Sequence, residues 1–508
     1  MKVAIIGSGL ASYASCIVLE KKKIIPDVYD VGVEAPKKIE NFKLRLREKF
    51  GNWSRLNIQM LNNFSKTEKN KFPRKKLFGS DFIYNYYDKS DLRNNPSFSN
   101  AFGGFSNVWS ASALFPNVND LKNWPKKALP KLSIYKKYFM HLPYTSENDN
   151  LEKYFPNLKK NFDKIQYDEK IVNLKKKLND INDNNFITGS PRIFIETKKK
   201  DLKCKFCGYC MTGCVFDSIF NSKIGFKELI NNKKINYFKN HEVVELKKIK
   251  NKVRIYFKES NKFVDYDKVF VGAGALSTTR IILNSLKKIK KVSLNHAALF
   301  VVPLISLKSF FFKWPKTNTL SKIFIELRNN KRDNWSHFQL NQPSEIVMNK
   351  MRYFQFNFFP FNIFYRFIFK RLFTLTGTLH SNLSGKYVVS LSKKNHKLNI
   401  KYIKNTLLKK NIKKIYSLLS KKLLQVKFFS SSYLINFGSK ADNYYLGGSF
   451  PMREKVIKNI HTNILGEFKN LKSVHLIDSS IFPSIPATTL GLLIMLNSAR
   501  ITDKVFEK

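Results

Sequence analysis

The chain has 508 residues, enough for two or three domains with large buried cores. It carries 91 Lys and Arg against 37 Asp and Glu, a formal net charge of +54, while 43% of its residues are hydrophobic and 14% are aromatic. This apolar content excludes a disordered polycation and indicates a folded, strongly basic protein, with nucleic acids and anionic membranes still open as partners.

The N-terminus predicts a dinucleotide-binding turn. A short apolar strand is followed by the turn Gly7-Ser8-Gly9, a helix, and a second strand that ends at Asp30. Glycines let backbone amides approach a pyrophosphate at the helix N-terminus, and a carboxylate after the second strand accepts from ribose hydroxyls. Gly7, Gly9 and Asp30 are therefore candidate cofactor residues, as is Ser12, which is small enough for close helix–strand packing. The alternative is an unoccupied turn of an α/β domain.

The rest of the chain predicts a mixed α/β order. Residues 145–200 alternate Lys-, Asn- and Asp-rich stretches and predict surface helices and loops. A strand over 268–271 ends in a second glycine turn, and residues 294–437 are richer in strands and aromatic side chains. The C-terminus returns to a strand over 474–477 and a helix from about Leu490.

Four of the five cysteines form the run Cys204-x2-Cys207-x2-Cys210-x3-Cys214. This is the spacing of a bacterial ferredoxin, and four thiolates on so short a loop can hold one 4Fe-4S cluster. Zinc sites usually separate two cysteine pairs by a longer loop, so zinc, a 3Fe-4S cluster and unligated thiols are the weaker alternatives. Because few cysteines remain for disulfides, a reducing, cytoplasmic setting fits best.

Several segments carry signatures of one family. The loop Gly103–Trp109 looks like GGSSxxxW, the segment Asp267–Ser285 is similar to AAGAxxTPxLLLxS, and Leu294–His296 looks like NLxDH. The stretch His475–Pro483 resembles xVVDASVFP. Together with the N-terminal turn, these segments resemble the FAD-dependent glucose–methanol–choline (GMC) oxidoreductases, in particular the branch with a Cys-rich iron–sulfur loop. Further candidate FAD-binding residues are then Gly103, Gly104, Ser106, Asn107, Val243, Gly274 and Asp478.

The candidate catalytic residues depart from the family pattern. The family's catalytic His, in an HxLGG or HxxGT motif, falls on Tyr444, and its partner position near residues 487–489 holds no Asn or His. A phenol with an unperturbed pKa of about 10 is a poor base but a competent proton donor. Tyr444 and Tyr445 are therefore catalytic candidates, or else an aromatic pair above the flavin. His380, on a strand facing the flavin pocket, is a third candidate, with a structural role as its alternative.

Residues 351–373 contain eleven Phe or Tyr and four cations. The segment is too often interrupted by polar residues to span a bilayer, but it could lie in a membrane interface. An aromatic core segment is the alternative. The basic runs elsewhere are scattered and belong to no nucleic-acid module, so specific nucleic-acid binding is not expected.

The sequence thus predicts an α/β fold with a discontinuous Rossmann-like FAD-binding domain over 1–290 and 437–508, the Cys-rich loop at 204–214, and a sheet-based substrate domain over 291–436. By resemblance, FAD oxidises CH–OH groups of a sugar- or alcohol-like substrate. The cluster then passes electrons to an external acceptor, a quinone or a redox protein. The predicted location is cytoplasmic, with peripheral contact at the inner face of the membrane as an option.

Three alternatives follow from the missing histidine. The first is a reductase in which Tyr444 donates the proton. The second is a catalytically silent protein that keeps FAD and the cluster. The third is a basic binder of membranes or nucleic acid with a vestigial flavin fold.

Overall fold

The structure is a computed structural model. It describes residues 1–63, 96, 98–210, 213–258, 262–308, 320–342, 371–392, 397–437 and 444–507. Of the aromatic segment 351–373, only the last three residues lie within these ranges.

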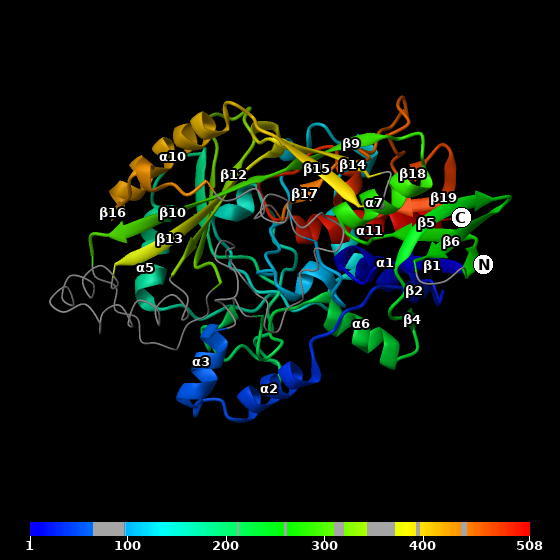
Figure 1. Ribbon diagram of the computed structural model, residues 1–508. Coiled ribbons are helices and arrows are strands. Elements are labelled where there is room, and N and C mark those ends of the chain that lie inside the picture. Colours follow the sequence, from blue (N-terminus) through cyan, green and yellow to red (C-terminus); the bar gives the residue numbers. More distant parts are fainter. Residues whose placement is uncertain are drawn as a thin grey trace.

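A mostly parallel sheet, with β18 as its one antiparallel strand among those described, brings the two ends of the chain together at the right of Figure 1. Its central strand β1 (Val3–Ile6) is apolar and buried throughout, as expected for a strand covered on both faces. β1 pairs in parallel with β2 and β8, and β8 pairs in parallel with β19 near the C-terminus. The other strands, in sheet order around β1, are β18 (Glu467–Phe468), β19 (Leu471–Leu476), β8 (Lys268–Val271), β2 (Asp27–Tyr29) and β4 (Asn236–Phe238).

Helices from both termini cover this sheet. Helix α1 (Leu10–Lys21) packs along α11 (Leu490–Val505), and Ser498 Oγ donates to the carbonyl oxygen of Ala11 at 2.6 Å. Further described helices beside this part of the fold are α6 (Ser222–Asn231) and α7 (Ala275–Ser285), labelled in Figure 1, and α4 (Leu132–Tyr138), which contacts α1 and α11.

A second, antiparallel sheet lies at the left of Figure 1. Successive side chains of its strands point to opposite faces of the sheet, and one face packs against α5 (Glu169–Asn179) and α10 (Leu408–Gln425) in a separate core. Buried residues of α10 recur at helical spacing, including Ile412, Tyr416 and Leu419. The strands, in sheet order, are β16 (Phe428–Phe429), β10 (Ala298–Ser306), β13 (Leu372–Leu379), β12 (Ser336–Asn341), β11 (Ile323–Leu327) and β3 (Phe186–Gly189).

Two smaller antiparallel sheets complete the described strands. One contains β5 (Val243–Ile249), β6 (Lys252–Phe257) and β7 (Phe263–Tyr266). The other contains β15 (Leu398–Ile403), β14 (Lys386–Leu391), β9 (Lys291–His296) and β17 (Leu446–Gly447). Tyr444 and Tyr445 precede β17. Because β17 pairs with the end of β9, these two residues lie near the point where the chain enters β10 of the six-stranded antiparallel sheet.

Two regions differ from the sequence-based expectation. Residues 186–189 lie in the stretch predicted as surface, yet all four are buried because β3 pairs with β11 at the edge of the antiparallel sheet. The polar region after residue 31, which has weak periodicity, contains α2 (Lys37–Glu48) and α3 (Arg55–Asn63). Across the described part of the chain, none of the helices combines the length and apolar character needed to cross a bilayer.

Candidate active site

A cavity of about 500 Å³ extends from the N-terminal turn to the antiparallel sheet, a volume typical of cofactor and ligand sites. One end is formed by the carboxyl ends of the parallel strands, where Rossmann-like folds bind nucleotides. Residues lining that end include Gly7, Ser8, Gly9, Asp30, His241, Val243, Gly274 and Asp478. Residues lining the other end include Trp109, Cys210, Ser321, Gln339, Asn341, Thr374, Thr376, Thr378, Tyr444 and Tyr445.

The first glycine turn leaves the N-terminus of α1 open toward the cavity. Gly9 caps α1 without any side-chain hydrogen bond, and a Cβ on Gly9 would meet no atom within 4 Å. Uncapped helix N–H groups and the positive end of the helix dipole together favour an anionic group such as a phosphate. Ser12 does not line the cavity: it is buried, with Oγ 3.4 Å from the carbonyl oxygen of Gly272, where it keeps α1 close to the sheet.

Asp30 lies at the end of β2 inside the same cavity. Its carboxylate Oδ2 accepts hydrogen bonds from Ser8 Oγ and from Tyr237 Oη, the latter at 3.1 Å. Burial raises the pKa of Asp30 to about 6, and these hydrogen bonds oppose the shift. A partly buried carboxylate beside an open glycine turn suits the ribose-binding role that the sequence predicts.

The second glycine turn is joined to the C-terminal segment by Asp478. The backbone N–H of Gly274 donates to Asp478 Oδ2 at 2.9 Å, and Thr278 Oγ1 donates to the same oxygen at 2.5 Å. Burial raises the pKa of Asp478, against these hydrogen bonds and that of Ser480. Gly274 has φ +89 and caps α7 without a side-chain hydrogen bond, so a second helix N-terminus faces the cavity.

The loop at 103–107 contacts the first turn rather than lying wholly on the cavity. The backbone N–H of Gly103 donates to Ser8 Oγ at 2.9 Å, and Asn107 Nδ2 donates to the carbonyl oxygen of Phe102 at 2.8 Å. Gly104 and Ser106 line the cavity, whereas Gly103 and Asn107 shape the loop behind it. Val243, at the start of β5, lines the end of the cavity that the carboxyl ends of the parallel strands form.

The catalytic candidates separate in the structure. Tyr444 and Tyr445 both line the cavity, and the ring of Tyr444 meets that of Phe105 edge-on with centroids 5.9 Å apart. Burial raises the pKa of Tyr445 to about 12, so this phenol stays protonated at neutral pH. His380 is absent from the lining. It is buried with Nε2 3.0 Å from the carbonyl oxygen of Asp120, a structural position.

The four clustered cysteines surround a second, small cavity. Its volume of about 10 Å³ leaves room for one water at most, and no three described His, Cys, Asp or Glu side chains are grouped as metal ligands. Burial raises the pKa of Cys204 to about 12 and also raises those of Cys207 and Cys214, with the neighbouring thiols adding to the shift. The residues thus supply the donor set of a cluster, but the loop would have to open to admit one.

Helices α2 and α3 cover the cysteine loop, which the sequence did not predict. Phe42 and Leu46 of α2 are buried against Tyr209 and Phe216 of the loop. Lys43 Nζ lies 2.6 Å from Asp217 Oδ1, and Arg47 pairs with the other oxygen of that carboxylate. Lys43 and Arg47 are one helical turn apart in the sequence, but the carboxylate that both contact lies 174 and 170 positions away, so no local pattern reveals the contact.

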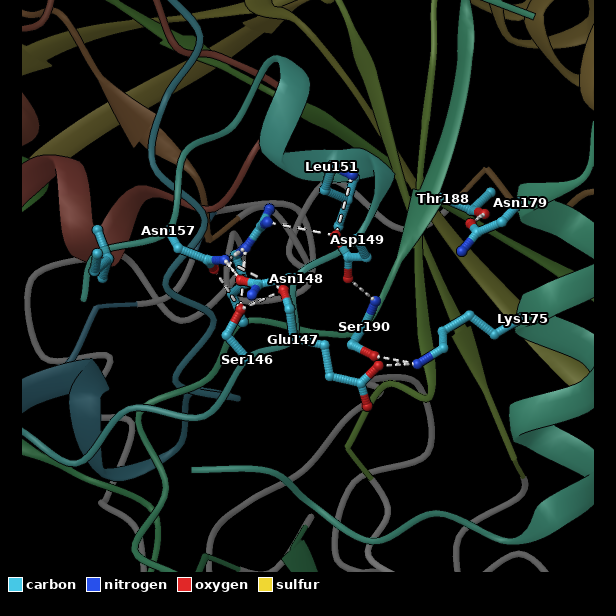
Figure 2. Close-up of polar contacts among 12 residues, drawn as sticks. Ser146, Glu147, Asn148, Asp149, Leu151, Asn157, Lys175, Asn179, Thr188 and Ser190 are labelled. Carbon is cyan, nitrogen blue, oxygen red and sulfur yellow. Dashed lines mark hydrogen bonds and ion pairs between the residues drawn. The ribbon is translucent and has the colours of Figure 1, made fainter. Parts of the chain in front are cut away.

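A buried polar network anchors the strand that precedes the loop, and Figure 2 shows its contacts. Asp149 accepts from the backbone N–H groups of Ser190 at 2.7 Å and Leu151 at 3.1 Å. The fully buried Arg192 donates through Nε to Asn157 Oδ1 at 2.8 Å. From this anchor the chain continues to Glu196, whose carbonyl oxygen accepts from the backbone N–H of Cys204 at 3.0 Å.

Cys210 lines both cavities and therefore joins the two candidate sites. Lys322 lies nearby with 2% exposure, immediately after Leu320 and Ser321 of the larger cavity. Burial lowers the pKa of Lys322 to about 7, while the electrostatic effects of Cys210 and Cys204 act in the opposite direction. Its Nζ lies 5.8 Å from the ring centroid of Tyr167.

The described elements form an α/β fold, with a mostly parallel, Rossmann-like sheet built from both ends of the chain and an antiparallel sheet beside it, which confirms the predicted fold class. No family model and no curated protein matches the sequence. Among solved structures, pyridoxine 4-oxidase from Mesorbium loti is similar, with a TM-score of 0.59 at 10% identity, over 99% of this chain and 98% of that chain. At this identity the likeness establishes the fold.

Proposed function

We propose that the protein is an FAD-dependent oxidoreductase that acts on the CH–OH group of an alcohol- or sugar-like substrate. The observation that carries the proposal is the meeting, in one cavity, of the uncapped α1 N-terminus, the open Cβ direction of Gly9 and the partly buried carboxylate of Asp30. FAD supplies a hydride acceptor when bound. Backbone N–H groups at the α1 N-terminus, beside Gly9, would receive its pyrophosphate, and Asp30 would accept from its ribose.

The proton chemistry at the substrate end rests on phenols. Of the described residues, His241 is the one imidazole that lines the cavity, and it lies at the nucleotide end with Nδ1 2.8 Å from the carbonyl oxygen of Lys239. Tyr444 stands where the resemblance places the catalytic base. A second candidate function follows: a reductase in which the Tyr444 phenol donates a proton to the reduced carbonyl.

We further propose that Cys204, Cys207, Cys210 and Cys214 hold an iron–sulfur cluster, as in the Cys-rich branch that the sequence resembles. Their convergence on one buried cavity and the buried Lys322 support an anionic group at this place. A cluster supplies single-electron transfer when bound. Since Cys210 also lines the larger cavity, the cluster would lie beside the flavin and serve an external acceptor such as a quinone or a redox protein.

Anaerobic purification with flavin, iron and sulfide analysis tests both groups. We expect stoichiometric FAD and an EPR-active cluster after dithionite reduction. Bleaching of the flavin by an alcohol or sugar under anaerobic conditions supports the oxidation, whereas reoxidation of reduced flavin by a ketone supports the reductase. A protein that is colourless and free of iron after reconstitution with FAD and iron contradicts the redox function altogether.

A further inference from the structure

Gln339, on the cavity wall, is tied to a buried glutamate–histidine pair. Strands β11 and β12 place Glu326 directly opposite His337, and Gln339 follows two residues later on the same face of the sheet. His337 Nδ1 lies 2.6 Å from Glu326 Oε1, and Gln339 Nε2 lies 3.1 Å from His337 Nε2. Glu326 and His337 are 0% and 1% exposed, whereas Gln339 lines the cavity.

The direction of these hydrogen bonds follows from the donors. An amide nitrogen can only donate, so Gln339 Nε2 donates to His337 Nε2. The imidazole proton is therefore on Nδ1, which donates it to Glu326. Burial raises the pKa of Glu326, while His337 and Arg192 oppose the shift, and Oε1 can accept the Nδ1 proton in either protonation state of the carboxyl. One hydrogen of the Gln339 amide nitrogen is used by His337, which leaves the carbonyl oxygen Oε1 as the acceptor that this cavity-lining residue can offer.

We propose that Glu326 and His337 fix the amide of Gln339 so that Oε1 accepts a hydrogen bond from a substrate hydroxyl, which makes Gln339 a specificity-determining residue and the buried pair its positioning residues. The proposal rests on the proposed function, in that it takes this cavity as the substrate site. It assigns a role to a pair that does not itself reach the cavity.

Two neighbouring side chains on the same wall, Asn341 and Thr378, also donate their hydrogen bonds within the sheet. Asn341 Nδ2 donates to the backbone carbonyl of Gln339 at 3.0 Å and to Thr376 Oγ1 at 3.3 Å. Thr378 Oγ1 donates to the backbone carbonyl of His337 at 3.2 Å. The donors of Asn341 and Thr378 are thus used within the sheet, which leaves their side-chain oxygens as acceptors, whereas the Thr376 hydroxyl accepts from Asn341 and keeps its own proton. Such a wall favours neutral hydroxyl donors and disfavours carboxylates, in spite of the net positive charge of the chain.

The imidazole tautomer can be read directly in the holoprotein. With 15N-labelled histidine, the resonances of His337 are assigned by their loss in His337→Gln. We expect the neutral Nδ1–H tautomer in the wild type and in Glu326→Gln, which keeps an accepting oxygen. Glu326→Met removes that oxygen, and His337 is expected to change to the Nε2–H tautomer. An Nε2–H tautomer in the wild type overturns the proposal even if the buried variants fail to fold.

The second measurement compares the binding of D-sorbitol and D-gluconate, each detected as a perturbation of the flavin absorbance. The two compounds differ in one terminal group, which is a hydroxyl in D-sorbitol and a carboxylate in D-gluconate. Gln339→Met, at a half-buried position, is expected to weaken D-sorbitol binding about tenfold, the worth of one hydrogen bond, with the tautomer unchanged. Glu326→Met is expected to reduce the D-sorbitol preference by a similar factor, and Glu326→Gln to preserve it. An unchanged preference in Gln339→Met overturns the proposal. If neither probe affects the wild-type flavin, the alcohol-oxidation proposal loses support, and the tautomer spectra still decide the positioning pair.

Discussion

A Cβ atom on Gly7 would lie 2.8 Å from the carbonyl oxygen of Gly272, so the two glycine turns can approach each other only because residue 7 has no side chain. Gly7 also has φ +96, a conformation that side chains strongly disfavour. Gly9, two residues later, has φ −73 and open space in its Cβ direction. One glycine therefore serves the fold, and the other leaves room for a ligand.

This contrast separates two effects of adding a methyl group. Gly7→Ala is expected to lower the free energy of unfolding by about 1–3 kcal/mol, through backbone strain and the contact with Gly272. Gly9→Ala is expected to leave the stability of the FAD-free protein unchanged but to weaken FAD binding at least about tenfold. Urea unfolding and flavin fluorescence titration measure the two quantities. Wild-type FAD affinity in Gly9→Ala would show that no phosphate approaches this turn.

The raised pKa of Asp30 predicts a pH-dependent cost in the FAD-free protein. Between about pH 4 and pH 6 the unfolded chain loses this proton while the folded chain keeps it, so stability falls as the pH rises through this window. Asp30→Asn removes the penalty and is expected to stabilise the FAD-free protein by about 1–2 kcal/mol above pH 6, with little effect at pH 4. Urea unfolding at several pH values checks this.

Asp265 provides a control with the opposite sign. Its hydrogen bonds from Arg254, at 2.8 and 3.0 Å, lower the pKa of this half-buried carboxyl. The pair therefore stabilises the fold above the unfolded pKa and loses its effect as the pH falls. Asp265→Asn is expected to cause a small loss of stability at neutral pH that disappears in acid. The same pH trend in both variants would contradict the assignment for Asp30.

The parts of the fold that were predictable from sequence are those in which local chemistry determines the structure. The strand at 268–271 lies where the sequence predicts it because its apolar run ends in a glycine turn. The helix from Leu490 does so because its apolar run follows a loop that contains prolines. β3 and the helix pair α2–α3 were not predicted, since their burial depends on partners more than 100 residues away. The wall residues Glu326, His337 and Gln339 meet only through strand register, which one sequence does not reveal.

Tyr444 is predicted to contribute a proton to the reaction while adding little to stability. Tyr444→Phe keeps the ring contact with Phe105 and should leave the melting temperature and flavin content unchanged. Single-turnover flavin reduction by an alcohol is expected to slow about 100-fold, the usual worth of general acid–base assistance. Tyr433→Phe, at a position 93% exposed, is the control. An unchanged rate removes Tyr444 from the chemistry.

The cysteine variants are predicted to differ in their effect on the flavin. Alanine at any of the four loop positions should abolish iron binding, whereas Cys16→Ala, in α1, should retain it. Cys210 lines the larger cavity, so Cys210→Ala should also shift the flavin absorbance, while Cys207, packed toward α2 and α3, should not affect it. Iron analysis and visible spectra of each variant measure both effects. Wild-type iron content in Cys207→Ala would contradict a four-cysteine cluster.

Lys322 is predicted to raise the reduction potential of the proposed cluster. An iron–sulfur cluster held by four thiolates is anionic and becomes more negative on reduction, so it would favour the protonated form of the buried Lys322, and this cation would stabilise the reduced state. Lys322→Met is expected to lower the potential by tens of millivolts, on the order of 1 kcal/mol for one electron, and Lys322→Arg to restore most of it.

Lys205 supplies the matched control for this charge. It also lines the small cysteine cavity but is exposed, so solvent screens its charge, whereas Lys322 is 2% exposed. Lys205→Met should therefore change the potential much less than Lys322→Met. Redox titration followed by EPR measures each midpoint, and iron content confirms that the variants are fully loaded. Equal shifts in the two variants would mean that burial gives Lys322 no special influence on the cluster.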